Sequence, residues 1–103
     1  MKVYNKLVRD RIPEIIAAQG KTCQYEVMSQ EAYRAALDQK LTEELREYHA
    51  SGELEELADL LEVIYAIAES RGETAQSLNA LAEEKAAARG RFREKYLLLS
   101  VDE

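Results

Sequence analysis

The middle of the sequence carries acidic residues at the spacing of one helix turn. Three lie in one run of apolar-patterned residues and two in the next, and a helix break at Ser51 and Gly52 separates the runs. Residues three or four apart share a face of a helix, so two antiparallel helices joined at this break would bring both groups together. Carboxylates gathered in this way repel one another unless a cation lies among them, and their oxygen atoms suit Mg²⁺. The five acidic residues are Glu43, Glu44, Glu47, Glu56 and Asp59.

A simpler interpretation of these residues is a solvated helix face. Glutamate is a good helix former, and most acidic positions on a helix face water. Two features favour the metal site. The acidic pairs recur on consecutive runs, and apolar residues such as Leu45 and Leu57 lie directly beside them. Some of the carboxylates are therefore expected to face inward.

The length, net charge and cysteine content of the chain limit its domain number, its partners and its location. The 103 residues predict a single domain over residues 1–103, and association into an oligomer would add buried area. The net charge of −6 argues against a nucleic acid or an anionic membrane as the main partner. Cys23 is the one cysteine, which excludes an internal disulfide, and no apolar run approaches the roughly 18 residues of a membrane span. The chain is expected to be cytoplasmic.

Hydrophobic periodicity predicts a mainly all-α chain. Ser29 is a good N-cap, and glycines at positions 20, 52, 72 and 90 are expected to end helices. Residues 22–27 favour a strand, and the apolar run at residues 95–99 is its expected partner in a short two-stranded ribbon. The predicted helices cover residues 14–19, 30–49, 53–71 and 74–89.

Two groups of cations lie far from the acidic centre in the sequence. A site that handles phosphate needs cations for the oxygens that a metal does not touch. Cations near a helix C-terminus are also favoured by the macrodipole alone, and for Arg89 this structural role is a full alternative. The first group is Lys6, Arg9 and Arg11, and the second is Lys85, Arg89, Arg91, Arg93 and Lys95.

Three motifs in order resemble one known family. Glu43-Glu44-x-x-Glu47 followed by Glu56-x-x-Asp59 resembles the signature of the all-α nucleoside triphosphate pyrophosphohydrolases, the MazG-like group, related to the all-α dUTPases and phosphoribosyl-ATP pyrophosphohydrolase. The opening from Tyr4 to Ile16 and the later Lys85-x-x-x-Arg89-Gly90-x-Phe92 resemble a small subfamily described as phosphoribosyl-ATP pyrophosphohydrolase-like. Eight residues separate Glu47 from Glu56, fewer than in many MazG proteins, so the connection must be tight.

The resemblance implies the four-helix-bundle-like fold of the all-α nucleoside triphosphate pyrophosphatases, in a homodimer or homotetramer. It also implies hydrolysis of a nucleoside triphosphate or a related phosphoanhydride to the monophosphate and pyrophosphate. It assigns Mg²⁺, with Mn²⁺ as a substitute, to Glu44, Glu47, Glu56 and Asp59. Either Glu44 or Glu47 would accept the proton of the attacking water. The triphosphate needs positive charge around it, and the family motifs contain matching cations. We therefore expect Lys6, Arg9, Lys85 and Arg89 to bind the phosphate oxygens.

The sequence excludes some other classes of protein and leaves two alternatives open. The sequence has no P-loop, and its single histidine, His49, excludes the paired Glu-x-x-His motifs of di-iron bundles. A small helical interaction protein that oligomerises through its apolar faces is the main alternative, and a relative that binds nucleotide without hydrolysing it lies between the two. In an enzyme the carboxylates converge on one point, whereas in an interaction protein they splay outward.

Overall fold

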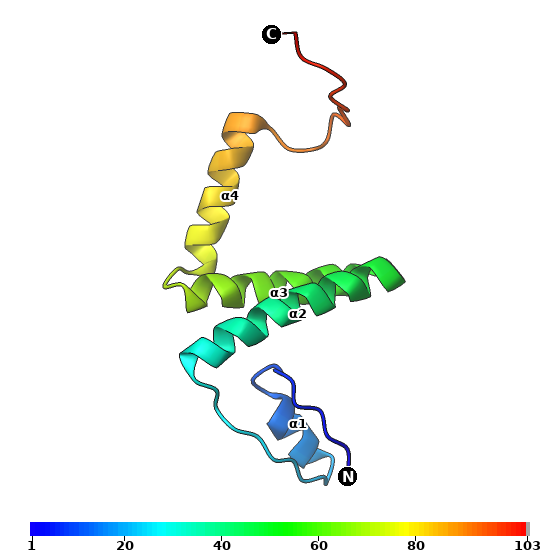
Figure 1. Cartoon of the computed structure of the whole chain (residues 1–103), viewed down its shortest axis with the longest axis vertical. Helices are drawn as coiled ribbons and strands as arrows, with labels where there is room; N and C mark the ends of the chain where they lie inside the picture. The colour runs from blue at the N-terminus through cyan, green and yellow to red at the C-terminus, as the bar shows by residue number, and fades with distance from the viewer. Residues whose placement is uncertain (103) are drawn as a thin grey trace.

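The computed structural model describes residues 1–102, which form four helices joined by turns and irregular segments (Figure 1). No strand occurs in this part of the chain, so the predicted all-α class is confirmed. All four predicted helices are present, and their ends differ from the predicted ends by a few residues at most. The helices are α1 (Ile12–Ala18), α2 (Gln30–Ser51), α3 (Leu54–Ser70) and α4 (Ala75–Arg89).

The centre of the fold is an antiparallel hairpin of α2 and α3, which lie side by side (Figure 1). Its buried apolar residues are Leu37 from α2 and Val63 and Ala68 from α3. At the end of the hairpin away from its turn, the Arg34 guanidinium donates hydrogen bonds to the Ser70 carbonyl, the shorter at 2.8 Å. Together with a hydrogen bond from the Gln30 side chain at 3.3 Å, these bonds satisfy a carbonyl at the end of α3 that has no partner within its own helix.

Local sequence signals explain where α2 begins and ends. The Ser29 hydroxyl accepts a hydrogen bond from the Ala32 N–H at 3.1 Å, as expected for an N-cap. Gly52 ends the helix with φ of +67°, in the left-handed region that glycine adopts without steric cost. One residue, Glu53, then separates Gly52 from α3, so the predicted tight connection is present.

The other two helices lie outside the hairpin. Thr74 and Ser77 form a reciprocal capping box that starts α4. The helix then points away from the hairpin, and the Tyr65 hydroxyl joins it to α3 through Asn79 at 3.2 Å (Figure 1). α1 packs against none of the other helices in the described part of the chain. The chain therefore reaches beyond its own core at both ends.

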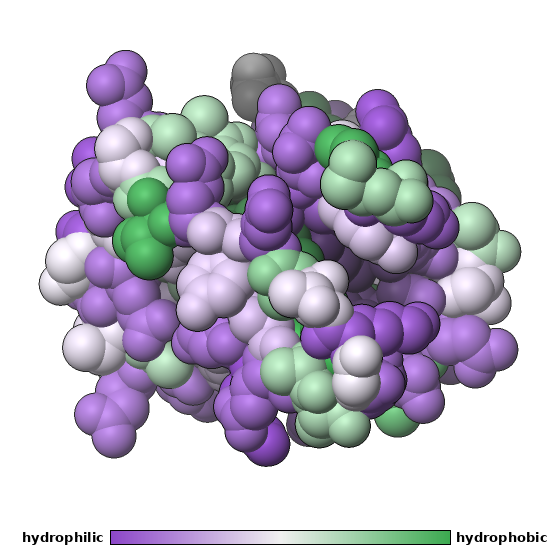
Figure 2. Space-filling model, turned by 90° about the horizontal axis from the view of Figure 1, so that it is seen from below, coloured by the Kyte–Doolittle hydropathy of each residue, from purple (hydrophilic) through white to green (hydrophobic). Residues whose placement is uncertain are grey.

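Much of the apolar surface is left exposed by this arrangement. The radius of gyration is 18.4 Å, whereas a compact chain of this length has about 13 Å. Apolar residues lie at the surface among charged ones (Figure 2), and they include Leu54, Leu81 and Phe92. None of the helices in residues 1–102 has the length and apolar character needed to cross a membrane. Exposed apolar area of this extent usually marks a surface that contacts another protein.

The predicted ribbon of residues 22–27 and 95–99 is wrong. Neither segment forms a strand, and most of their side chains are exposed. They also lie at opposite ends of the molecule, one after α1 and the other beyond α4 (Figure 1). Strand-forming side chains alone do not make a ribbon, because an isolated two-stranded pair needs a packed face to be stable.

We expect Gly52→Ala to destabilise the hairpin by about 1 kcal/mol, because alanine pays a steric penalty at positive φ. A Cβ at this position would meet no other atom within 4 Å, so the loss would come from the backbone conformation alone. Gly52→Asn should lose less, since asparagine tolerates the left-handed region better. Urea unfolding of the three proteins measures the difference, and equal losses for the two variants would contradict this explanation.

Candidate metal centre

The short turn at Gly52 places the acidic residues of the two helices opposite each other. One carboxylate oxygen from each of Glu43, Glu44 and Glu47 lies within 4.8 Å of the other two. A second group of three, Glu44, Glu56 and Asp59, meets the same limit and joins the end of α2 to the start of α3. Glu44 belongs to both groups, so it is the centre of the cluster. All four predicted metal ligands are therefore brought together, with Glu43 beside them.

Glu44 is buried, with 7% of its surface exposed. Its Oε1 atom lies 3.6 Å from the Lys40 ammonium, whereas its Oε2 atom is buried and has no hydrogen-bond partner. An ionised carboxylate without a partner is expensive to bury, because it loses its water and gains nothing in return. The helix register nevertheless holds the Glu44 carboxylate within the acidic cluster, where a cation would satisfy its unpartnered oxygen.

The pKa values of the cluster reflect this crowding. Burial raises the pKa of Glu44 above its ordinary value, and the negative charge of Glu47 raises it further. Burial and the charges of Glu47 and Asp59 likewise raise the pKa of Glu56. Glu43 differs, because its hydrogen bond with Lys6 lowers its pKa. Glu44 and Glu56 therefore hold their protons more tightly in the folded protein than free carboxyl groups do.

Three cations lie against the cluster. The predicted Lys6 and Arg9 both reach it: the Lys6 ammonium lies 3.1 Å from Glu43, and the Arg9 guanidinium donates to Asp59 at 2.8 Å. The sequence analysis missed Lys40, whose ammonium lies 3.7 Å from Glu43 and 3.6 Å from Glu44. Its spacing of three and four residues from these glutamates could have indicated that it lies beside them on the helix.

Lys85 and Arg89, the other two predicted phosphate ligands, are not brought to the cluster within one chain. Both lie in the second half of α4, which extends away from the hairpin, whereas the cluster lies at the hairpin turn (Figure 1). Arg89 borders a hollow of about 620 Å³ with three other cations, Arg91, Arg93 and Lys95. The end of α4 is therefore a concentrated positive surface.

The donor set fits a hard divalent cation. Carboxylate oxygens are the protein ligands of Mg²⁺ and Mn²⁺, and this cluster offers no nitrogen or sulfur donor. The observation that tests the fit is Glu44 Oε2, a buried oxygen without a hydrogen-bond partner on the residue that both groups of carboxylates share. Glu44, Glu47, Glu56 and Asp59 are the residues that can hold such an ion.

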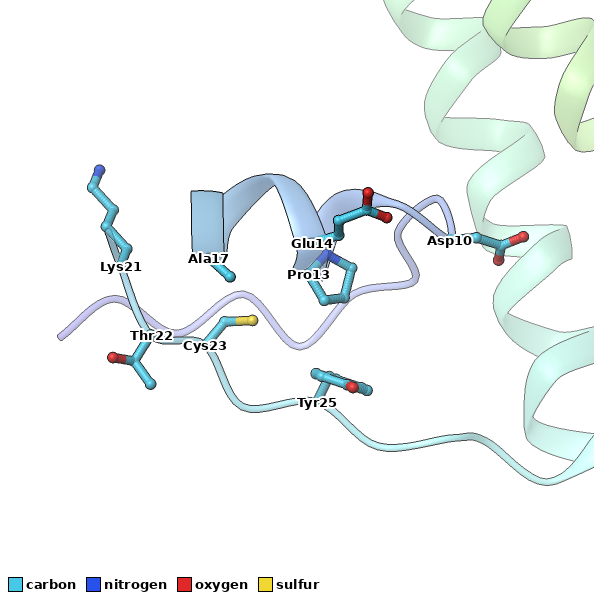
Figure 3. Close-up of a pocket in the computed structure, with 8 residues that line it drawn as sticks. All are labelled: Asp10, Pro13, Glu14, Ala17, Lys21, Thr22, Cys23 and Tyr25. Atoms are coloured by element: carbon cyan, nitrogen blue, oxygen red, sulfur yellow. The ribbon is translucent and has the colours of Figure 1, made fainter. Parts of the chain in front are cut away.

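A separate hollow of about 470 Å³ lies between α1 and the segment that follows it (Figure 3). Pro13 and Ala17 border it on the helix side, and Thr22, Cys23 and Tyr25 border it on the other. Asp10, Glu14 and Lys21 also border it. Among the described residues, no group of three possible metal donors gathers at this hollow, so the acidic cluster remains the candidate site.

Comparison with known proteins adds little beyond this geometry. No family model and no solved structure matches the chain. A stretch of 46 residues is 52% identical to an uncharacterized protein of Mycolicibacterium smegmatis. That stretch covers 45% of this chain and 47% of the relative, so the two are similar over about half their lengths. Function is therefore inferred from the site itself.

In the presence of EDTA, we expect the melting temperature to rise as the pH falls from 7 toward 4.5, the ordinary value of these carboxyl groups. Glu44 and Glu56 hold their protons more tightly in the folded state, so protonation favours folding, and this contribution is lost as the pH rises through their raised pKa values. Glu43 acts with the opposite sign, but only below 4.5. Scanning calorimetry across this pH range measures the effect.

Glu44→Gln should raise the stability at pH 7 by about 1 kcal/mol, or roughly 4–8 °C, because it removes the crowded buried charge. It should also flatten the pH dependence. Glu62→Gln, which removes an exposed charge from α3, is the matched control and should change neither. A lower melting temperature for Glu44→Gln at pH 7 would show that its carboxylate is already satisfied in the folded protein.

Proposed function

We propose that this protein is a Mg²⁺-dependent pyrophosphohydrolase that cleaves a nucleoside triphosphate to the monophosphate and pyrophosphate. The observation that carries the proposal is the buried, unpartnered Glu44 Oε2 at the centre of five carboxylates from two helices. The resemblance of three sequence motifs to the MazG-like group supports the same reaction. A solvated acidic face does not account for Glu44, because its side chain is turned inward.

The residues of the site divide into ligands, a base and phosphate contacts. Glu44, Glu56 and Asp59 would hold the metal ion from both helices. When bound, Mg²⁺ would neutralise phosphate charge and lower the pKa of a coordinated water. Glu47 has an exposed side chain, so it is the carboxylate placed to accept the proton of that water. Lys6 and Arg9 would hold oxygen atoms of the triphosphate, where they stabilise the leaving pyrophosphate.

Glu47→Gln and Asp59→Asn should each lower the rate of pyrophosphate release by at least about 10²-fold, since one removes the base and the other a ligand charge. The assay uses a panel of canonical and modified nucleoside triphosphates with Mg²⁺, with Mn²⁺ and with EDTA. Glu62→Gln is the control and should keep full activity. Unchanged turnover in either site variant, with circular dichroism showing a folded protein, would contradict the assignment.

We also propose that the active form is a homodimer or a higher homo-oligomer, in which a second copy covers the exposed apolar surface. The open shape of the single chain supports this, because the chain buries few apolar residues. Large ones such as Leu54, Leu81 and Phe92 stay exposed to water. Charge complementarity points the same way. At the end of α4, Arg91 pairs with Glu83, whereas Lys85 and Arg89 form no ion pair within the described residues. The hairpin of a second copy would offer them an acidic cluster. Association would bring Lys85 and Arg89 to that cluster.

Mixing two inactive variants tests this arrangement. A Glu47→Gln chain lacks the base, and a Lys85→Ala, Arg89→Ala chain lacks the two cations. If the cations act on the partner's cluster, each mixed dimer contains one complete site, and co-refolding at equal concentrations should restore about a quarter of the native activity. If they act within their own chain, no mixed dimer contains a complete site. No recovery in a mixture shown by sedimentation to contain dimers would therefore contradict the proposal.

The second candidate function is a helical interaction protein, which the exposed apolar surface also favours. The two functions differ in how the acidic cluster behaves. In the enzyme, Mg²⁺ binds to it and raises the melting temperature, because a ligand that binds the folded state stabilises it. Calorimetry with Mg²⁺ alone separates them, and no binding together with no turnover would favour the interaction protein.

A further inference from the structure

The N-terminal segment, residues 1–11, is attached to the hairpin in an unusual way. In the described part of the chain, two ion pairs are the polar contacts that join residues 1–28 to α2 and α3. One is Lys6 with Glu43 on α2, and the other is Arg9 with Asp59 on α3. α1, which follows directly, packs against no other helix. The segment is therefore held at the hairpin by its cations.

Both ion pairs use carboxylates of the acidic cluster. Glu43 belongs to the group on α2, and Asp59 belongs to the group that joins the two helices. A divalent cation held by Glu44, Glu56 and Asp59 would compete directly with Arg9 for the Asp59 carboxylate. Its positive charge would also repel Lys6, whose partner Glu43 lies within the same cluster. The two pairs are poor competitors, because the Lys6 and Arg9 side chains keep 45% and 58% of their surface exposed to water.

We propose that Lys6 and Arg9 hold the cluster together while no divalent cation is bound, and move from the carboxylates to the oxygen atoms of a bound triphosphate once one is. This inference rests on the proposed function, because it concerns the regulation of the same site. The position of the N-terminal segment relative to the hairpin then depends on whether a metal ion and a triphosphate are bound at the cluster. As positioning residues, Lys6 and Arg9 keep a carboxylate-rich site folded when it is empty and supply positive charge to phosphate when it is filled.

The exchange makes metal and phosphate binding favour each other. A bound metal ion would take Asp59 from Arg9 and weaken the attraction of Lys6 to Glu43, which would leave both cations free near the site. A phosphate chain that takes up those cations removes the competitors of the metal. By linkage, each ligand then raises the affinity of the other. Lys40 does not take part in the movement, because it extends from α2 itself and reaches Glu43 and Glu44 within two helix turns.

The test compares the double variant Lys6→Gln, Arg9→Gln with the matched control Lys2→Gln, Arg11→Gln. Both remove two positive charges from the N-terminal segment. Arg11 pairs with Glu14 beside it, and Lys2 lies over the Tyr4 ring, so neither touches the cluster. Titration calorimetry with Mg²⁺ alone should show about three- to tenfold tighter binding to the double variant, and a change within about twofold for the control.

A phosphate probe should respond in the opposite direction. At saturating Mg²⁺, inorganic tripolyphosphate should bind the double variant more weakly than the native protein, since two of its cations are gone. Residues that merely support the fold would weaken the binding of both ligands when replaced. Tighter Mg²⁺ binding together with weaker tripolyphosphate binding therefore identifies the exchange.

A distance measurement on the otherwise native chain tests the movement directly. Nitroxide labels at Val3→Cys and Glu62→Cys, in a Cys23→Ser background, report the separation of the N-terminal segment from α3. Double electron–electron resonance should show a longer or broader distance distribution when Mg²⁺ is added, and this result decides the matter even if the double variant fails to fold.

The outcomes separate this inference from the proposed function. If the native protein binds Mg²⁺ and releases pyrophosphate, but the double variant binds Mg²⁺ no more tightly than the control and the label distance does not change, the exchange is wrong and the proposed function stands. If the native protein neither binds Mg²⁺ nor turns over any nucleotide, both are wrong.

Discussion

Repulsion among the carboxylates around buried Glu44 is the constraint on which the rest of this structure depends. Five acidic side chains meet where α2 turns back into α3, and one of their oxygen atoms is shut away from water without a partner. Such a cluster is stable only with positive charge nearby. The fold supplies that charge from two directions, from Lys40 on α2 and from Lys6 and Arg9 on the N-terminal segment. A divalent cation with a phosphate ligand would satisfy the same need more completely.

The open shape of the chain reflects a second unmet need, the burial of apolar surface. The hairpin buries Leu37, Val63 and Ala68, which is a small core for 103 residues. α4 and the tail beyond it carry apolar and positive side chains away from that core (Figure 1). A second copy would bury the apolar surface and meet the positive end of α4 with its own acidic cluster. In the proposed oligomer, a single association would therefore supply both the larger core and the additional cations.

Local features of this fold could be predicted from the sequence because they depend on neighbouring residues. Helix periodicity, the Ser29 cap and the glycines at helix ends all act within a few positions, and the four helices follow them closely. The acidic cluster could be predicted for a similar reason. Once two helices are joined by a turn as short as the one at Gly52, i,i+3 spacing on each leaves little freedom in where Glu44, Glu47, Glu56 and Asp59 point.

The sequence by itself therefore determined the helices, their ends and the acidic set. Only the tertiary structure decided which distant residues contact these helices and the acidic residues. It brought Arg9 to Asp59, fifty positions away, while it left Arg89 outside the site of its own chain. It also kept residues 22–27 and 95–99 apart, so their strand-forming composition had no effect. The physical reason is that spacing controls which side chains share a helix face, whereas contacts between distant segments depend on how whole helices pack.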